Sequence, residues 1–566
     1  MLLCASGPAN AQPCRGNTLS SEGIGYTRRC RKTTGSATAT ERTVTLESGR
    51  KSMEGIADVL GNLRKKGVSL WSNNGQLHYR APQGVLTQDE IERLSTCKPH
   101  LIALLERASV AQSAPPMREP RPHLDRAPLA FSQLAHWNLY QLRERRAIRQ
   151  IASATRLAGR IDIAALRKCV AELVRRHAAL RTRIVVSDAI PTQQIAKSAC
   201  NIALEVIDLA DLSEPSREAE VYRRIEGLIL EPIDVTVDPL FEVELLRLRE
   251  DEHVLLVAME HMISDAFSMS ILLRELFTAY TQALQGRDFA LPAIPVQFAD
   301  YAAWQCNTRD SWIEKHGVYW SVHLRGCQRC RFPADEYLAT DPRLGWGTVR
   351  VQIAKEWKTQ LREWCRLRHT TLVMSVFTAY AALVLRWCNV SDTVIQYQSD
   401  GRISAAIENA LGYFASPLYL RLELREGDNF VDLLRRVIEE YCKACEHADH
   451  SYIAAQVPAP EFTRNSCFNW VPQGTKRELS GLDGSEYAIT CCPVSFVHPM
   501  LKSLETDAEP FILLYETERE ITGDVCFKRS QLSTSTMERF GRNFVLFIET
   551  LLTQPEERVR SIGLLR

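Results

Sequence analysis

One stretch near the middle of the chain combines residue types that could transfer protons. His261 follows an apolar, β-prone run from Val254 to Met259, and Asp265 lies four positions further on, where a helix should begin. Loops between rigid elements are where reacting groups are usually placed. Because an imidazole titrates near neutral pH, His261 could act as a general base toward an attacking amine or hydroxyl. A satisfied core histidine is the alternative interpretation of the same pattern.

The charged neighbours of His261 require partners of their own. Asp265 should be partly buried, and a buried carboxylate requires a cation or several hydrogen-bond donors. Arg181, in the segment RRHAALRT, is the predicted partner. Glu260 precedes His261 at the end of the strand, where the alternation of side chains points it away from His261.

Interleaved helices and strands must position these groups. From residue 127 onward, helical patterns such as IDIAALRKCVAELVRRH alternate with strand-like runs such as VRVQI and FILLYE. This alternation predicts an α/β (α+β) body. Its length suggests two lobes, which we place at residues 127–293 and 294–566.

Composition excludes several classes of protein. Of the 566 residues, 45% are hydrophobic and 24% are charged, which is a globular balance. The 69 basic and 68 acidic residues leave no folded part with the basic excess of a nucleic-acid binder. The apolar run from Leu372 to Leu385 is shorter than the ~20 residues that a bilayer requires, and the N-terminus lacks a secretory pattern. We therefore expect a cytoplasmic protein without a membrane partner.

The cysteines indicate a reducing compartment. There are 17, an odd number, and most stand singly in apolar stretches, so a disulfide scaffold is not expected. Two groups have the spacing of metal ligands, namely Cys327 with Cys330, and Cys442 and Cys445 with His447 and His450. The second group is too cramped for a usual zinc finger, so we predict core cysteines and no metal site.

The first 126 residues divide into three parts. Residues 1–52 lack apolar periodicity and are expected to be disordered or an over-extended start, with a transit peptide as the alternative. Residues 53–107 predict a helix, a β-hairpin around an Asn-Gly turn and two further helices. Residues 108–126 are a proline-rich linker.

The hairpin module is suited to binding a partner. An exposed hairpin strand can accept a partner's peptide as an added strand. A plain structural cap is the alternative. The residues expected to shape side-chain pockets or to attract acidic groups are Trp71, Leu77, Tyr79, Lys65, Lys66 and Arg80.

Several motifs in order resemble one family. EHMISDA, which contains His261, resembles the HHxxxDG motif of nonribosomal peptide synthetase condensation domains, relatives of chloramphenicol acetyltransferase. RRHAALRTRI resembles the RHxxLRT motif, and PVQFADYAAWQ the YxDYAxW motif. APLAFSQLAHWNLYQL resembles the opening motif, LGYFASPLYLR the IGxFxNT segment, and CFNWVPQ the strand that crosses between lobes. Residues 53–107 are similar to the β-hairpin docking domains of such synthetases.

The resemblance implies two acyltransferase-like lobes in a V, with a tunnel between them. A carrier protein would deliver an acyl thioester on its phosphopantetheine arm, and the acceptor would enter from the other side. His261 would be the critical histidine, and Asp265 would form a structural salt bridge with Arg181. The protein itself would bind no metal or cofactor. The expected tunnel residues are Ser268, Tyr413, Asn469 and Trp470.

The segment EHMISDA departs from the HHxxxDG motif at two positions. Glu260 replaces the first histidine, and Ala266 replaces the final glycine, which would narrow or redirect the tunnel. Because His261 and Asp265 are retained, we expect an active enzyme.

The expected activity is that of a stand-alone condensation enzyme supplied by an upstream carrier protein, whose acidic C-terminal tail binds the hairpin. The acceptor would be a second carrier-bound group, giving elongation, or a free amine or alcohol, giving chain release. A coenzyme A-dependent acyltransferase, a non-catalytic recruitment platform and an epimerising relative are the alternatives.

Overall fold

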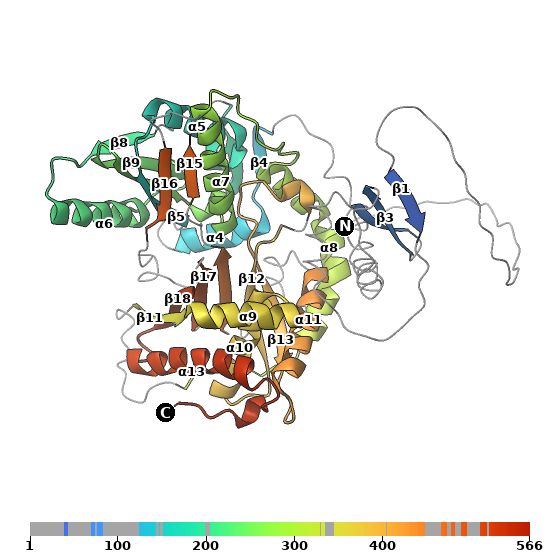
Figure 1. Cartoon of the computed structure of the whole chain (residues 1–566). Helices are drawn as coiled ribbons and strands as arrows, with labels where there is room; N and C mark the ends of the chain where they lie inside the picture. Colours follow the sequence, from blue (N-terminus) through green and yellow to red (C-terminus); the bar gives the residue numbers. More distant parts are fainter. Residues whose placement is uncertain are drawn as a thin grey trace, which may run out of the picture.

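Two large lobes, one above the other in Figure 1, make up most of the chain. The computed structural model describes residues 39–43, 69–73, 76–82, 124–142, 147, 151–197, 204–328, 330–333, 345–368, 370–402, 404–447, 466–472, 477–480, 488–494, 510–517 and 520–565. Each lobe contains a six-stranded sheet. The long helix α8 (Phe298–His323) follows the last element of the first lobe and leads into the second.

The sheet of the first lobe has the strand order β15-β16-β5-β10-β9-β8. Its strands are β5 (Ile151–Ala158), β8 (Glu205–Asp208), β9 (Phe241–Arg249), β10 (Glu252–Met259), β15 (Arg477–Ser480) and β16 (Ala488–Pro493). The central strand β10 pairs antiparallel with both β5 and β9. It is therefore held on both edges.

Helices cover both faces of this sheet. Leu255, Val257 and Met259 of β10 belong to a core shared with α4 (Phe131–Leu142), α5 (Ile163–Arg176) and α7 (Ala266–Leu284). The alternate residues of β10 pack instead with α6 (Glu214–Leu230) in a second cluster. A strand that is buried on both faces has a continuous run of apolar residues, and β10 has such a run from Val254 to Met259.

The sheet of the second lobe has the order β11-β18-β17-β14-β12-β13. Its strands are β11 (Trp346–Ile353), β12 (Asp392–Ser399), β13 (Ser416–Glu423), β14 (Cys467–Pro472), β17 (Phe511–Glu516) and β18 (Ile521–Lys528). The helices that complete its core are α9 (Lys355–Leu367), α10 (Leu372–Trp387), α11 (Phe430–Glu446) and α13 (Thr534–Thr553).

Helix α10 is the apolar segment noted in the sequence, and most of its residues are buried. Within the described ranges, no single helix is long and apolar enough to cross a membrane. Helices α9 and α10 pass that test of length and composition only as a pair, and they meet at 105°.

The sequence range of the second lobe contributes two strands to the sheet of the first. β15 and β16, which lie in the sequence range assigned to the second lobe, pair with each other and add to β5 of the first. The motif CFNWVPQ was expected to make this crossing, but β14 stays in the second sheet, between β12 and β17. The crossing strands are therefore β15 and β16.

Two small sheets complete the described elements. β4 (Arg126–Pro128), β7 (Ile190–Ile195) and β6 (Thr182–Ser187) form one of them, in the order β4-β7-β6. The other contains the predicted hairpin, β2 (Ser69–Asn73) and β3 (Gln76–Pro82).

A third strand extends the hairpin sheet. β1 (Ala39–Thr43) pairs antiparallel with β3, so the expectation that residues 1–52 do not fold is wrong for this segment. Its five residues are mostly polar, and without alternating apolar residues the sequence carries no strand signal there. The helices expected on either side of the hairpin lie outside the described residues.

Candidate functional site

The segment around His261 joins the end of β10 to the start of α7. Glu260 caps a single 3-10 turn, η2 (His261–Ile263), and Asp265 caps α7 by accepting the amide N–H of Ser268 at 2.7 Å. The predicted strand, connection and helix are all present. Both caps are acidic residues at helix N-termini, where an acceptor satisfies amides that have no partner within the helix.

His261 is held in one tautomer. Its Nδ1 atom lies 2.7 Å from the carbonyl oxygen of Ser264, which can only accept, so Nδ1 donates. In the neutral ring, Nε2 therefore carries the lone pair. The ring of Tyr413 lies against that of His261, with centroids 3.9 Å apart. His261 is thus fixed from both lobes with its second nitrogen available as a base.

The protein interior holds His261 in its neutral form. Burial lowers the pKa of His261, and the nearby His136 lowers it further. Glu260, the Ser264 carbonyl and Asp265 act in the opposite direction. Since the net shift is downward, the ring is neutral at pH 7, as a general base requires.

Asp265 is paired with Arg402, and the predicted pairing with Arg181 is wrong. The Arg402 guanidinium donates to Asp265 at 2.9 and 3.1 Å, and both side chains are almost fully buried. The amides of Phe414 and Ala415 also donate to Asp265, each at 3.1 Å. This carboxylate therefore connects the start of α7 in the first lobe to the 400–415 segment of the second.

Arg181 lies elsewhere in the first lobe. Its guanidinium donates to the backbone carbonyls of Val174, Arg175 and Ala196. These bonds fix the turn η1 (Ala178–Arg181) against α5 and the end of β7.

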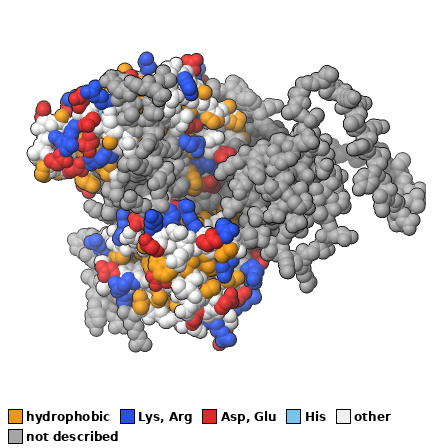
Figure 2. Space-filling view, viewed as in Figure 1, with side chains coloured by type: hydrophobic (Ala, Val, Ile, Leu, Met, Phe, Trp, Pro, Cys, Tyr) orange, Lys and Arg blue, Asp and Glu red, His pale blue; other side chains and the backbone are white. Residues whose placement is uncertain are grey.

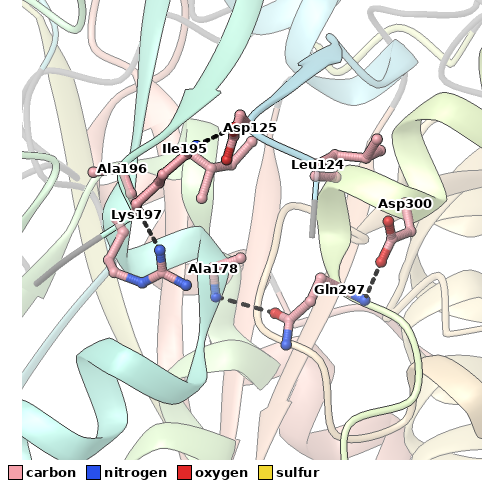
Figure 3. Close-up of a pocket in the computed structure, with 10 residues that line it drawn as sticks. Leu124, Asp125, Ala178, Ile195, Ala196, Lys197, Gln297 and Asp300 are labelled. Atoms are coloured by element: carbon pink, nitrogen blue, oxygen red, sulfur yellow. Dashed lines mark hydrogen bonds and ion pairs between the residues drawn. The ribbon is translucent and has the colours of Figure 1, made fainter. Parts of the chain in front are cut away.

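The Arg181 side chain also lines a pocket of about 270 Å³. Figure 3 shows this pocket, where the Gln297 amide oxygen accepts the N–H of Ala178. Lys197 and Asp125 form an ion pair of 3.0 Å at the same pocket.

Ser268 is a crosslink between the lobes, contrary to the tunnel position expected for it. Its hydroxyl is fully buried, lies 2.8 Å from Asp265 Oδ1 and accepts the amide N–H of Gly412 at 3.1 Å. A Cβ atom on Gly412 would lie 2.2 Å from the Phe298 ring, so only glycine fits this contact. Ala266 is the first residue of α7 and is half-buried beside this crosslink.

Asn469 and Trp470, the other expected tunnel residues, are adjacent on β14 and half-buried. Trp470 packs against the core of the second lobe. Because side chains alternate along a strand, Asn469 lies on the opposite face. Of the four predicted tunnel residues, Tyr413 is the one whose ring lies against His261.

His136 belongs to the site but was not predicted from the sequence. This residue of α4 has its Nε2 atom 2.8 Å from Glu260 Oε1, and its ring centroid lies 5.8 Å from that of His261. The Glu260 side chain was expected to point away from His261; it binds His136, whose ring lies near that of His261. Gln133, one turn earlier, donates to the carbonyl oxygen of Met262 at 2.7 Å.

The cysteine and histidine group weighed as a metal site has other contacts. His447 stacks on Tyr319 at 3.6 Å and its Nδ1 lies 2.8 Å from that of His316, while His450 lies outside the described residues. In the part of the chain that the structure describes, no group of three or more His, Cys, Asp or Glu side chains could hold a metal ion.

The surface carries charges of both signs. Around α6, at the outer end of the first lobe, acidic and basic side chains lie next to one another, as Figure 2 shows. Arg156 pairs with Glu218, and Arg223 pairs with Glu220. This end of the lobe is therefore a network of ion pairs and not a basic surface.

Comparison with known families identifies this arrangement. Residues 123–566, which include both lobes and the His261 site, match the family described as "Condensation domain". The chain belongs to the condensation-domain family. Condensation domains are acyl-transferring, amide-bond-forming enzymes of nonribosomal peptide synthetases. Residues 56–107 match the "TubC N-terminal docking domain".

Curated relatives are much longer than this condensation domain. It is 27% identical to the chondramide synthase of Chondromyces crocatus, over 82% of this chain but 12% of that protein. Phosphinothricin tripeptide synthetase of Streptomyces viridochromogenes is 30% identical over 84% of this chain and 44% of its own length. The chain thus spans less than half of either relative.

Solved structures share the fold. The X-domain from teicoplanin biosynthesis matches with a TM-score of 0.64 and 24% identity, covering 80% of this chain and all of that one. The first condensation domain of the calcium-dependent antibiotic synthetase matches with a TM-score of 0.64 and 19% identity, covering 78% of this chain and 99% of that one. The expected two-lobed acyltransferase-like architecture is confirmed.

The residues predicted for docking are described only in part. Trp71 lies on β2, opposite His78 in the register, while Leu77, Tyr79 and Arg80 lie on β3. Lys65 and Lys66 lie outside the described residues.

Proposed function

We propose that this chain transfers an acyl chain from the phosphopantetheine thioester of a carrier protein to an amine or hydroxyl acceptor. The observation that carries the proposal is the fixed tautomer of His261. With Nδ1 donating to Ser264, the Nε2 lone pair of the neutral ring is available at the junction of the lobes. The ion pair between Asp265 and Arg402 holds α7, the helix that follows His261, in place.

The reaction balances with His261 as the only proton carrier. As the acceptor attacks the thioester carbonyl, its proton passes to His261 Nε2, and a C–N or C–O bond forms. The tetrahedral species then collapses, the C–S bond breaks, and the proton passes to the departing thiolate. The alternative role of the His261 imidazole is to position the acceptor and to stabilise the tetrahedral species without taking up the proton.

The substrates require delivery by partners. We propose that the hairpin module binds the acidic C-terminal tail of an upstream carrier protein as an added strand. Because β3 pairs on one side with β1 and on the other with β2, the added strand would extend an outer strand or displace β1. We also propose a cytoplasmic setting, supported by the odd number of cysteines in the chain, 17, which does not suit a disulfide scaffold.

Intact-protein mass spectrometry of an acyl-loaded carrier tests the reaction. The carrier is incubated with the full chain and with small amines, with alcohols or with a second loaded carrier. Loss of the acyl group to a free acceptor indicates chain release, and its appearance on the second carrier indicates elongation. Transfer from acyl-coenzyme A without any carrier would favour the coenzyme A-dependent alternative. No transfer with any acceptor would contradict the proposal and favour a recruitment platform.

The role of His261 is tested by substitution. His261→Ala should lower the single-turnover rate by about 10²–10⁴-fold, the usual contribution of a general base. His253→Ala is the matched control, because it removes a buried imidazole from the opposite end of the same strand, β10. A His261→Ala rate within threefold of the parent rate would refute the assignment.

A further inference from the structure

A buried carboxylate lies directly before His261. The Glu260 side chain is fully buried, and its Oε2 atom accepts the amide N–H of Met262. Its other oxygen lies 2.8 Å from His136 Nε2. Since a buried carboxylate is stable only when donors or cations satisfy it, Nε2 of His136 carries the proton of this bond.

His136 cannot move independently of the site. Helix α4 is connected to the η2 turn by Gln133, which donates to the Met262 carbonyl at 2.7 Å while its own oxygen accepts the Ala130 amide at 2.9 Å. Gln133 is fully buried. The distance from His136 to the turn that holds His261 is therefore fixed by hydrogen bonds from two neighbouring turns of α4.

Both histidines contact the same tyrosine. The Tyr413 ring lies 3.9 Å from that of His261 and 6.1 Å from that of His136, in an edge-on arrangement with the latter. The rings of the two histidines are 5.8 Å apart at an interplanar angle of 56°. Two imidazoles, one carboxylate and one phenol thus form a compact group of titratable side chains.

The titratable side chains around His261 come from four segments of the chain. His136 lies on α4, Glu260 precedes η2, Asp265 precedes α7, and Tyr413 lies on the 400–415 segment. Asp265 is neutralised by Arg402. Asp265 also raises the pKa of His261, but it is unchanged in every variant below, so the charges that the variants alter are those of His136 and Glu260.

We propose that His136 and Glu260 form a positioning pair that sets the orientation and the charge state of His261 during acyl transfer. Glu260 fixes the ring of His136, and a positive charge on His136 disfavours protonation of the His261 ring beside it. Glu260 offsets part of this effect, so the proton affinity of His261 depends on the balance between them. The expected effect on the rate of acyl transfer rests on the proposed function. The effect of His136 and Glu260 on the protonation of His261 does not.

Substitution of His136 and substitution of Glu260 should shift the pH profile of kcat/KM in opposite directions. His136→Gln keeps a donor for Glu260 but removes the imidazole, so the acidic limb of kcat/KM should move to higher pH. Glu260→Gln removes the carboxylate, so the limb should move to lower pH. At these separations, shifts of about one pH unit are expected in each direction. The double variant should return close to the parent profile.

The assay uses the full chain, a loaded carrier and one acceptor at every pH, so that ionisation of the acceptor is common to all variants. Arg366→Gln is the control for loss of a charge, because Arg366 is an exposed residue of α9 in the second lobe. A merely structural pair would lower the rate without moving the limb. That result, or shifts of both variants in the same direction, would overturn the proposal.

A direct titration separates this proposal from the proposed function. NMR of the chain labelled at histidine Cε1, with the His261 resonance assigned by His261→Gln, follows its protonation in each variant without substrate. Opposite displacements in a protein that transfers no acyl group would uphold the pair and reject the function. Identical His261 titrations in the parent, His136→Gln and Glu260→Gln would reject the pair even in an active enzyme. Variants that fail to fold are replaced by His136→Asn and Glu260→Asn, which remove the same imidazole and the same carboxylate and are judged by the same titration.

Discussion

Substitution of Arg402 is the sharpest test of how the two lobes are held at the site. Arg402→Met keeps the aliphatic part of the side chain but removes the cation that neutralises Asp265. The Asp265 side chain is 1% exposed and that of Arg402 is 5% exposed, so water cannot replace the lost bonds. Removing one member of a buried ion pair costs about 3–5 kcal/mol of stability.

The structure places the expected loss at the lower end of that range. After Arg402→Met, Asp265 still accepts three backbone N–H bonds, from Ser268 at 2.7 Å and from Phe414 and Ala415 at 3.1 Å. We therefore expect the free energy of unfolding to fall by about 3 kcal/mol. Arg181→Met removes bonds to the backbone carbonyls of Val174, Arg175 and Ala196 and should cost about 1 kcal/mol.

Urea unfolding followed by tryptophan fluorescence gives these values, provided that the slopes of the transitions agree among the variants. A double-mutant cycle with Asp265→Asn then isolates each pairing. The coupling of Asp265 to Arg402 should exceed about 2 kcal/mol, and that of Asp265 to Arg181 should lie within about 0.5 kcal/mol of zero. Equal losses for Arg402→Met and Arg181→Met, or a larger coupling to Arg181, would refute the assignment.

Two further predictions concern packing and pH. Gly412→Ala should destabilise the protein by about 1–3 kcal/mol, because its Cβ would overlap the Phe298 ring, whereas Gly427→Ala has no atom within 4 Å and should be neutral in the same urea titration. Burial lowers the pKa of His316 to about 4. The unfolded chain therefore binds more protons below pH 6.5, and stability should fall as the pH drops from 6.5 toward 4. His316→Gln should flatten that dependence in urea titrations at each pH, and an unchanged slope would contradict it.

Local features of the site followed from the sequence, and long-range partners did not. The run before His261 and the capping position of Asp265 are properties of neighbouring residues, so periodicity and capping rules were enough to predict them. Arg402 is separated from Asp265 by 137 positions, and His136 from Glu260 by 124. No spacing rule links residues that only the tertiary fold brings together.

The predicted pairing of Arg181 with Asp265 was wrong because the sequence does not show which residues the fold brings together. An arginine in a short motif and a buried acid elsewhere are a reasonable pair by charge alone. In the structure, the backbone carbonyls around η1 satisfy Arg181, and a less conspicuous arginine from the second lobe reaches the acid. Similarly, the sequence of β16 does not tell which of the two sheets the strand joins.

The placement of β16 against β5 also determines the order in which the protein can be completed during synthesis. β5 ends at Ala158 and β16 begins at Ala488, so more than 300 residues are translated between them. At about 5–20 residues per second, the outer edge of β5 waits from roughly 15 seconds to a minute for its partner. An unpaired edge of this kind is a template for association with other chains. A fragment of the first lobe expressed without β16 would therefore leave this edge of β5 unpaired.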